Sequence, residues 1–166
     1  MGNKKLVAGI VIFSLVFIIG SYLLLNSSSK PQSKVLSYSS KDKEKPIAEV
    51  KESFKDFGKI KVSDSQKATF IVKNIGTKPL QLSDVNSSCG CTVGQIIYKG
   101  SESKEFGMHS PGTEVFEIAP QTEAQVRVTY RPFVMPVNGL VEREVYMNTN
   151  DPDNSKLIFK VKAFVN

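Results

Sequence analysis

The sequence predicts an all-β domain, an immunoglobulin-like β-sandwich of seven to eight strands, preceded by one N-terminal transmembrane helix and a flexible linker. Three observations support this prediction. An uncharged apolar run occupies Leu6–Leu25, a Ser- and Lys-rich stretch follows it, and alternation of apolar and polar residues begins after Lys45. Alternation with a period of two is typical of half-buried strands.

The apolar run Leu6–Leu25 predicts a membrane-spanning helix. Its twenty residues, rising about 1.5 Å each, match the roughly 30 Å of a bilayer's hydrocarbon core. A cleaved signal peptide would have a shorter apolar region and a small-x-small cleavage site. We therefore expect an uncleaved signal-anchor, with residues 1–5 forming a cytoplasmic N-terminus.

Residues 26–45 are rich in Ser and Lys and contain few apolar side chains. Such a segment cannot bury enough surface to order itself, and it predicts a flexible linker. The folded domain is then expected at 46–166. Lysines flank both ends of the apolar run, so the positive-inside rule does not by itself decide which end lies in the cytoplasm. The short basic start, Lys4 and Lys5, favours a single-pass protein with its C-terminal domain outside the cytoplasm, in the periplasm or on the outer surface.

The net charge is +6, which raises the question of a nucleic-acid partner. From Pro46 onward there are fifteen Lys and Arg against fourteen Asp and Glu, a difference of +1. Almost all of the excess therefore lies outside the predicted domain. A nearly neutral domain argues against nucleic-acid binding.

The strands follow from the alternation in chain order. Two strands are the clearest examples: Ala124–Tyr130 places an apolar residue at every second position, and the last strand, Leu157–Val165, repeats the pattern with lysines opposite. We expect those lysines to protect an exposed sheet edge. The full set of expected strands is Ile47–Phe54, Lys67–Lys73, Leu80–Ser83, Thr92–Tyr98, Val115–Ile118, Ala124–Tyr130, Val141–Asn148 and Leu157–Val165. Two facing sheets are needed to bury that many inward faces.

Several motifs occur in an order that resembles the bacterial domain-of-unknown-function 1573 family. They are Phe57-Gly58-Lys59-Ile60, Phe70-Ile71-Val72-Lys73-Asn74-Ile75-Gly76, Pro79-Leu80, Ser88-Cys89-Gly90-Cys91-Thr92 and Thr149-Asn150-Asp151-Pro152. The resemblance covers about Ile47–Val165. It implies an immunoglobulin-like domain, similar to Hydin-type and major-sperm-protein-type modules, in exported or membrane-anchored bacterial proteins, with no established reaction. Its structural motif residues are Gly58, Asn74, Gly76, Gly90, Thr92, Asn150, Asp151 and Pro152.

The chain departs from the family between Tyr98 and Pro120, where a longer stretch contains Met108 and His109. This insertion leaves the strand assignment between Ile97 and Gln121 open. Inserted loops can carry binding function. Lys99–Gly112 is therefore the best candidate for a contact loop.

Both cysteines of the chain lie in Cys89-Gly90-Cys91-Thr92. On a strand, residues i and i+2 are roughly 6.5 Å apart, near the long limit for a disulfide. A turn at Gly90 would shorten that distance. Three interpretations remain open: a local structural element, a thiol-redox site, and a soft-metal site for Cu(I). The redox interpretation needs a nearby cation, and the sequence shows none next to Cys89.

A Cu(I) site would need a third ligand besides the two thiolates. Met108 and His109 are the first candidates, and Met135 and Met147 are further ones. Zinc fits less well, because a structural zinc site takes four ligands and the chain has two Cys and one His.

Catalytic patterns are missing from the sequence. With one His, a Ser-His-Asp triad cannot be argued beyond coincidence, and no Gly-rich phosphate loop follows a strand. We therefore expect a non-enzymatic, membrane-anchored extracytoplasmic binding or assembly module with a protein partner in the cell envelope. We expect no small-molecule substrate and no cofactor other than Cu(I). The alternative is a Cu(I)-binding or thiol-redox accessory factor for an exported metalloenzyme.

Overall fold

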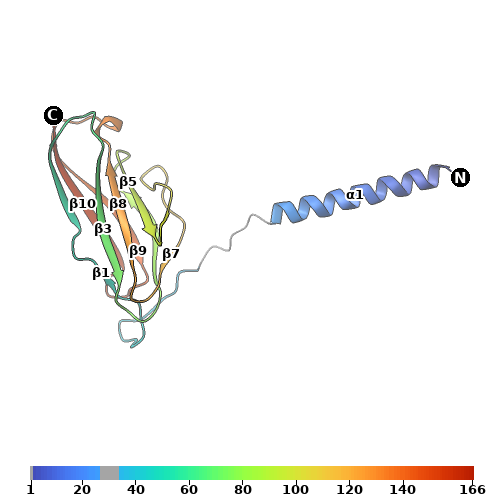
Figure 1. The fold of residues 1–166 in the computed structure, drawn as a ribbon, viewed down its shortest axis with the longest axis horizontal. Coiled ribbons are helices and arrows are strands. Elements are labelled where there is room, and N and C mark those ends of the chain that lie inside the picture. The colour runs from blue at the N-terminus through green and yellow to red at the C-terminus, as the bar shows by residue number, and fades with distance from the viewer. Residues whose placement is uncertain (1, 27–33) are drawn as a thin grey trace. The chain divides into compact units, whose positions relative to one another are not determined.

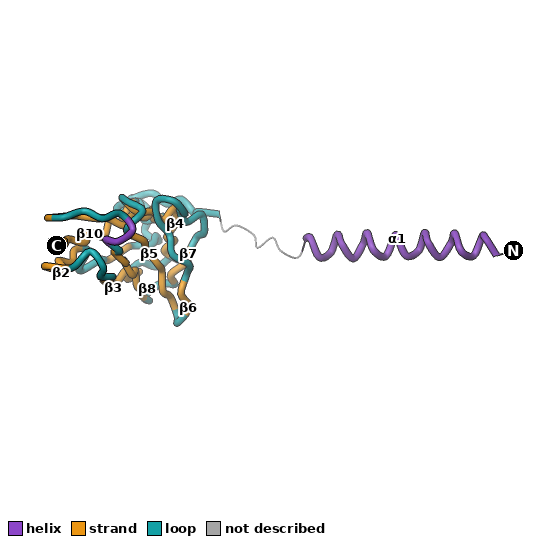
Figure 2. Tube along the Cα trace, turned by 90° about the horizontal axis from the view of Figure 1, so that it is seen from above, coloured by secondary structure: helices purple, strands orange, loops and turns teal. Residues whose placement is uncertain are grey.

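The computed structural model describes residues 2–26 and 34–166 as two separate units (Figure 1). The first contains the helix α1 (Gly2–Asn26), which coincides with the segment expected to be helical. Within the described residues, no helix combines the length and apolarity that a membrane span requires. The second unit is a β-sandwich, in which helix is restricted to the single turn η1 (Pro132–Val134) (Figure 2).

The sandwich consists of two five-stranded sheets. The first sheet has the order β1 (Ala48–Glu49), β3 (Gln66–Asn74), β8 (Glu123–Tyr130), β5 (Thr92–Tyr98) and β6 (Ser101–Glu102). The second has the order β2 (Phe54–Ile60), β10 (Lys156–Val165), β9 (Gly139–Thr149), β4 (Leu80–Ser87) and β7 (Phe116–Ile118). All pairings are antiparallel except that of β2 with β10. The predicted all-β class with two sheets is confirmed.

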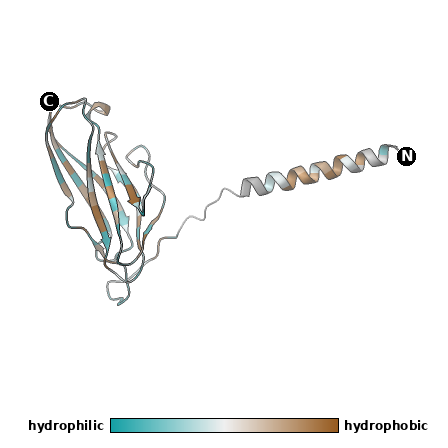
Figure 3. Cartoon of the chain, in the orientation of Figure 1, coloured by the Kyte–Doolittle hydropathy of each residue, from teal (hydrophilic) through white to brown (hydrophobic). Residues whose placement is uncertain are grey.

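Alternation places the core between the sheets. In β3, β8 and β10 every second residue is buried, and the strands in Figure 3 carry alternating hydrophobic and hydrophilic bands. Phe70 of β3 stacks on Phe159 of β10 across the two sheets, with 5.1 Å between ring centroids. Burying both rings removes a large apolar area from water, which stabilises the fold.

The expected first strand, Ile47–Phe54, differs most from the structure. The chain pairs with β3 only at Ala48 and Glu49, then leaves the first sheet and joins the second as β2. A bulge at Gly58 interrupts β2, since two residues of β10 oppose three of β2. Gly58 has φ +67°, which favours glycine.

The last strand was expected at an exposed edge, and this prediction is wrong. β10 lies between β2 and β9 and is hydrogen-bonded to both. The strand β2 forms the edge of this sheet. Most of its residues are exposed, and buried and exposed residues do not alternate along it. Alternation of apolar and polar residues therefore does not reveal β2 in the sequence. Without β2, β10 is taken for the edge strand of the sheet.

The expected flexible linker, 26–45, also differs from the structure in its second half. Residues 27–33 lie outside the described residues, whereas 34–45 pack on the sandwich. The buried Gln81 side chain accepts a hydrogen bond from the Leu36 N–H at 2.7 Å and donates to the Lys34 carbonyl at 3.2 Å. The Thr77 N–H donates to the Lys45 carbonyl at 3.0 Å. Polar contacts therefore hold this segment against the sandwich.

The insertion after Tyr98 packs along one side of the sandwich, across the edges of the two sheets. Phe106 is fully buried and packs edge-on against Phe116. Its backbone exchanges two hydrogen bonds of 2.8 Å with Gly94 of β5, and the Gly112 N–H donates to Val85 of β4. The insertion therefore covers the outer edges of β4 and β5.

Candidate functional site

The two cysteines lie in the tight turn that carries the chain from β4 in one sheet to β5 in the other. They form a disulfide, Cys89–Cys91, with their Cα atoms 5.3 Å apart. The turn at Gly90 shortens the distance below the strand value, as expected. A backbone hydrogen bond from the Thr92 N–H to the Cys89 carbonyl closes the turn.

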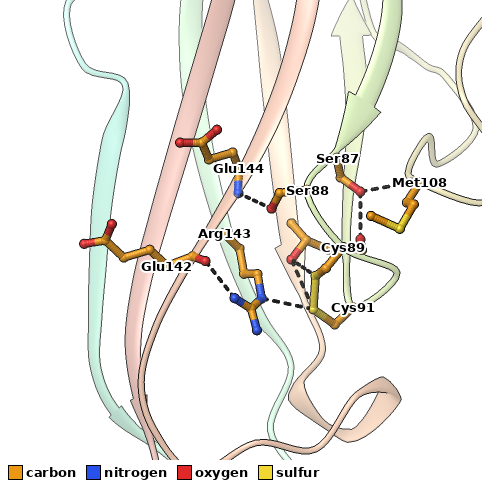
Figure 4. The surroundings of a disulfide bond; sticks show 9 residues. Ser87, Ser88, Cys89, Cys91, Met108, Glu142, Arg143 and Glu144 are labelled. Atoms are coloured by element: carbon orange, nitrogen blue, oxygen red, sulfur yellow. Dashed lines mark hydrogen bonds between the residues drawn. A yellow bond between two sulfur atoms is a disulfide. The ribbon is translucent and has the colours of Figure 1, made fainter.

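An arginine from another strand contacts the disulfide. The Arg143 Nε–H of β9 donates to Cys91 Sγ at 3.3 Å, and its Nη1 donates to the Glu142 carbonyl at 2.8 Å (Figure 4). The Thr92 Oγ1 lies 3.4 Å from Cys89 Sγ and 3.8 Å from Cys91 Sγ. Since disulfide sulfurs carry no hydrogen, the Thr92 hydroxyl is the donor.

The pairing of β4 with β9 brings Arg143 to the sulfurs. Just beyond β4, the Ser88 N–H donates to the Glu144 carbonyl, and the Ser88 hydroxyl accepts from the Glu144 N–H, both at 2.9 Å. Arg143 is the neighbour of Glu144 and thereby reaches Cys91, 52 residues away in sequence. Sequence inspection around Cys89 could not find this cation.

Of the four side chains proposed as a third metal ligand, two lie beside the cysteine turn. An ideal Cβ on Gly90 would lie 2.8 Å from His109 Nε2 and 3.9 Å from Met135 Sδ, so both side chains cover the turn. Met108 is 48% exposed, and Met147 is buried in the core. Among the described residues, no three His, Cys, Asp or Glu side chains are grouped to hold a metal ion.

A bidentate ion pair fastens the insertion beside this turn. Arg131 follows β8, and its N–H donates to the Cys91 carbonyl at 2.8 Å. Its guanidinium donates two hydrogen bonds to the Glu105 carboxylate. That hydrogen bonding holds the pKa of Glu105 below its ordinary value, although burial acts in the opposite direction.

The other motif residues form hydrogen bonds that join strands. Asn74 donates its side-chain amide to the Lys78 and Ile118 carbonyls and accepts the Gly76 N–H. Asn150 accepts the Gln81 N–H at 2.8 Å and donates to the Pro79 carbonyl. These contacts belong to the scaffold of the sandwich.

Asp151 is the most enclosed carboxylate of this network. It is fully buried and accepts the Ala48 N–H at 2.9 Å, the Asp153 N–H at 2.9 Å and the Asn154 side-chain amide at 3.0 Å. It thereby ties β1 to the turn between β9 and β10, in which Pro152 follows it.

A second feature of interest is the outer edge of β3. Eight residues of β3 pair with β8 without interruption, whereas only Lys73 and Asn74 pair with β1 on the other side. The Asn74 backbone bonds toward β8, to Thr122 and Gln121. Because successive residues of an antiparallel strand bond to opposite sides, the N–H and C=O groups of Lys67, Thr69 and Ile71 point to the open side.

A groove follows this open edge. It has a volume of about 360 Å³ and lies between β3 and the segment that crosses from β1 to β2. The crossing segment contributes Glu49, Lys51 and Glu52, and β3 contributes Thr69, Ile71 and Lys73. Ile71 is 40% exposed there.

Comparison with family models gives a match to the first half of the domain. Residues 48–105 match the family described as "Protein of unknown function (DUF1573)". The resemblance to this family expected from the motifs is confirmed, over β1 to the start of the insertion. Comparison with curated proteins gives no match.

Comparison with solved structures gives several similar chains. A protein of unknown function from Porphyromonas gingivalis W83 superposes with a TM-score of 0.55 at 20% identity, covering 74% of this chain and 48% of that one. The chain thus spans about half of that relative. The PapD-like domain 7 of human CEP192 gives a TM-score of 0.49 at 12% identity, covering 83% and 97%. At these identities the likeness concerns the fold alone.

Proposed function

We propose that this chain is a non-enzymatic protein-binding module, anchored in the cell membrane by its N-terminal helix, with the sandwich outside the cytoplasm. It binds an extended segment of a cell-envelope protein as an added strand on the outer edge of β3. The uncovered backbone of Lys67, Thr69 and Ile71 is the observation that carries this proposal. Such edges bind peptides through main-chain hydrogen bonds.

The edges of the sandwich differ in how they are protected. β2 carries the Gly58 bulge and charged residues, both of which discourage strand addition. The insertion covers β5, and β7 covers the start of β4. β3 has neither bulge nor proline along Lys67–Val72, so among the described strands it offers the longest regular edge. The adjoining groove has room for side chains of an added strand.

The groove also indicates the character of the partner segment. Both of its sides carry both signs of charge: Glu49, Lys51 and Glu52 come from β1 and the crossing segment, and Lys73 of β3 and Glu123 of β8 come from the other side. Ile71 adds an apolar surface between them. This arrangement suits a strand that alternates apolar with charged residues of either sign.

The alternative expected from the sequence, Cu(I) binding, requires free thiolates. In the described structure both cysteines are paired. His109 and Met135 do lie beside the turn, but strand addition uses groups that are exposed as the protein stands.

The edge is tested by photocrosslinking in the full-length protein in its native membrane. A photoreactive residue at Thr69 should give an adduct with a partner protein. The same residue at Ile158, which is 39% exposed but belongs to the internal strand β10, should give none. Adding Ile71→Pro removes one N–H from the open edge and leaves the ladder to β8 intact. The adduct should then fall roughly tenfold, as expected for the loss of one hydrogen bond and its neighbours.

Three outcomes would contradict strand addition at this edge. They are equal adducts at Thr69 and Ile158, an adduct unaffected by Ile71→Pro in a variant of unchanged melting temperature, and an adduct made only of two copies of this chain. The last would show that the edge pairs with itself.

The anchor and its orientation rest on the composition of Leu6–Leu25 and are tested separately. A reporter enzyme that is active only outside the cytoplasm, fused after Asn166, should be active. The fusion should remain in the membrane pellet after alkaline carbonate extraction. A silent but stable fusion, or a mature product without residues 1–25, would refute the anchored topology.

A further inference from the structure

The disulfide has a polar environment that a purely structural crosslink does not need. Arg143 is half-buried, and its Nε–H points at Cys91 Sγ. In the described part of the chain, no carboxylate forms an ion pair with it. A partly buried guanidinium without a counter-ion gains little from a neutral sulfur, but it would strongly stabilise a thiolate.

A hydroxyl group extends this environment. The Thr92 hydroxyl, itself buried, lies within reach of both sulfurs. Together with the Arg143 Nε–H it places donors where a negative sulfur would form.

The two sulfurs are not equivalent. Arg143 contacts Cys91, which is 2% exposed, whereas Cys89 is 8% exposed. An incoming thiolate reaches Cys89, the more exposed of the two residues, more easily. The sulfur that leaves is the one beside the guanidinium, and a thiol of lower pKa leaves faster.

We propose that Cys89–Cys91 is a thiol–disulfide exchange site that accepts electrons from a protein dithiol, with Arg143 stabilising the thiolate that leaves. A thiolate of the dithiol attacks Cys89 Sγ, forming a mixed disulfide and breaking the Cys89–Cys91 bond. Cys91 leaves as the thiolate against Arg143. The second thiol of the dithiol loses its proton and attacks the mixed disulfide. The dithiol becomes a disulfide, Cys89 leaves as a thiolate and takes up a proton, and two electrons reach this chain.

A protein, rather than a small thiol, fits the surface around the turn. Exposed apolar side chains belong to the two segments that cover it. Met108 is 48% exposed in the insertion, while Phe133, Val134 and Met135 are each 50% exposed at and after η1. Met135 Sδ reaches the side of Gly90 between the cysteines. Apolar surface of this kind marks sites of protein contact.

This inference does not depend on strand addition at β3, and Arg143 provides its test. In Arg143→Met the apolar stem remains and the charge is lost. Reduction of the full-length protein by dithiothreitol should slow roughly fivefold to tenfold, and the pKa of the Cys91 thiol should rise by about one unit. Arg143→Lys should restore most of both. Arg127→Met, which removes an arginine paired with Glu102 away from the sulfurs, should change neither.

The measurements are the rate of disulfide loss and the pH dependence of thiol alkylation in the reduced protein, both followed by mass. A brief exposure to a monothiol, quenched in acid, should place the adduct on Cys89. A reduced Cys-x-x-Cys oxidoreductase should react faster than dithiothreitol at equal thiol concentration. Equal rates in Arg143→Met and in the unmodified protein, or adducts mainly on Cys91, would overturn the assignment. A rate no faster than dithiothreitol would overturn the choice of a protein dithiol.

Discussion

Replacing Asp151 with alanine is expected to lower the free energy of unfolding by about 3 kcal/mol, because buried donors lose their acceptor. The carboxylate is fully buried and accepts three hydrogen bonds, from Ala48, Asp153 and Asn154. The Ala48 N–H is itself in a buried position, so it would lose its acceptor away from bulk water. The loss should appear as a lower midpoint in urea denaturation of the full-length protein.

The neighbouring acid provides a matched control. Asp153 pairs with Lys45 at the surface, where its side chain is 49% exposed. Ion pairs at such positions contribute roughly 0–1 kcal/mol, so Asp153→Ala should leave the midpoint nearly unchanged. Asp151→Asn keeps one carbonyl oxygen and should lose less than Asp151→Ala. Equal midpoints for Asp151→Ala and Asp153→Ala would show that burial of the carboxylate does not anchor β1.

The strands that alternate were predictable because alternation reports burial directly. In β8 and β10 the predicted inward residues are the buried ones, and their bounds agree within a residue. β2 escaped prediction because its residues are nearly all exposed along an edge. Without one buried face, a strand leaves no period in the sequence.

The segment 34–45 shows a different limit. Its composition correctly indicates that it buries little apolar surface, and from that the sequence analysis inferred flexibility. The structure orders it through backbone groups that bond to Gln81 and Thr77. Backbone hydrogen bonds do not depend on side-chain hydropathy, so composition carries no record of them.

At the cysteines, the sequence identified the pair and missed its surroundings. The short spacing around Gly90 was sufficient to predict that a turn would bring the sulfurs within reach. Arg143 could not be identified from the sequence, because it lies 52 residues from Cys91 and only the pairing of strands brings the two together. Which distant strands pair depends on the topology of the sheets. Alternation does not define that topology, and it also did not reveal that the chain crosses from the first sheet to the second between β1 and β2.

Gly76→Ala is expected to destabilise the domain by about 3 kcal/mol, because the added methyl group would overlap backbone atoms that cannot swing aside. A Cβ at this position would lie 2.4 Å from the Lys45 carbonyl oxygen and 2.5 Å from the Ile47 nitrogen. The chain on both sides is tied down by hydrogen bonds from Ile75 to Ile47 and from Thr77 to Lys45. Relief therefore requires that residues 45–47 move away and that these bonds break.

The position of the damage distinguishes this substitution from a general loss of packing. Ile75→Ala changes a neighbouring side chain that is 40% exposed and should cost well under 1 kcal/mol. In Gly76→Ala, hydrogen exchange should accelerate first at the amides of Ile75 and Thr77. Detachment of β1 would also add Lys73 to the open edge of β3. Crosslinking from Thr69 should then persist while the domain stays folded. Its loss would mean that the wall of the groove, Glu49–Glu52, holds the partner instead of the strand edge.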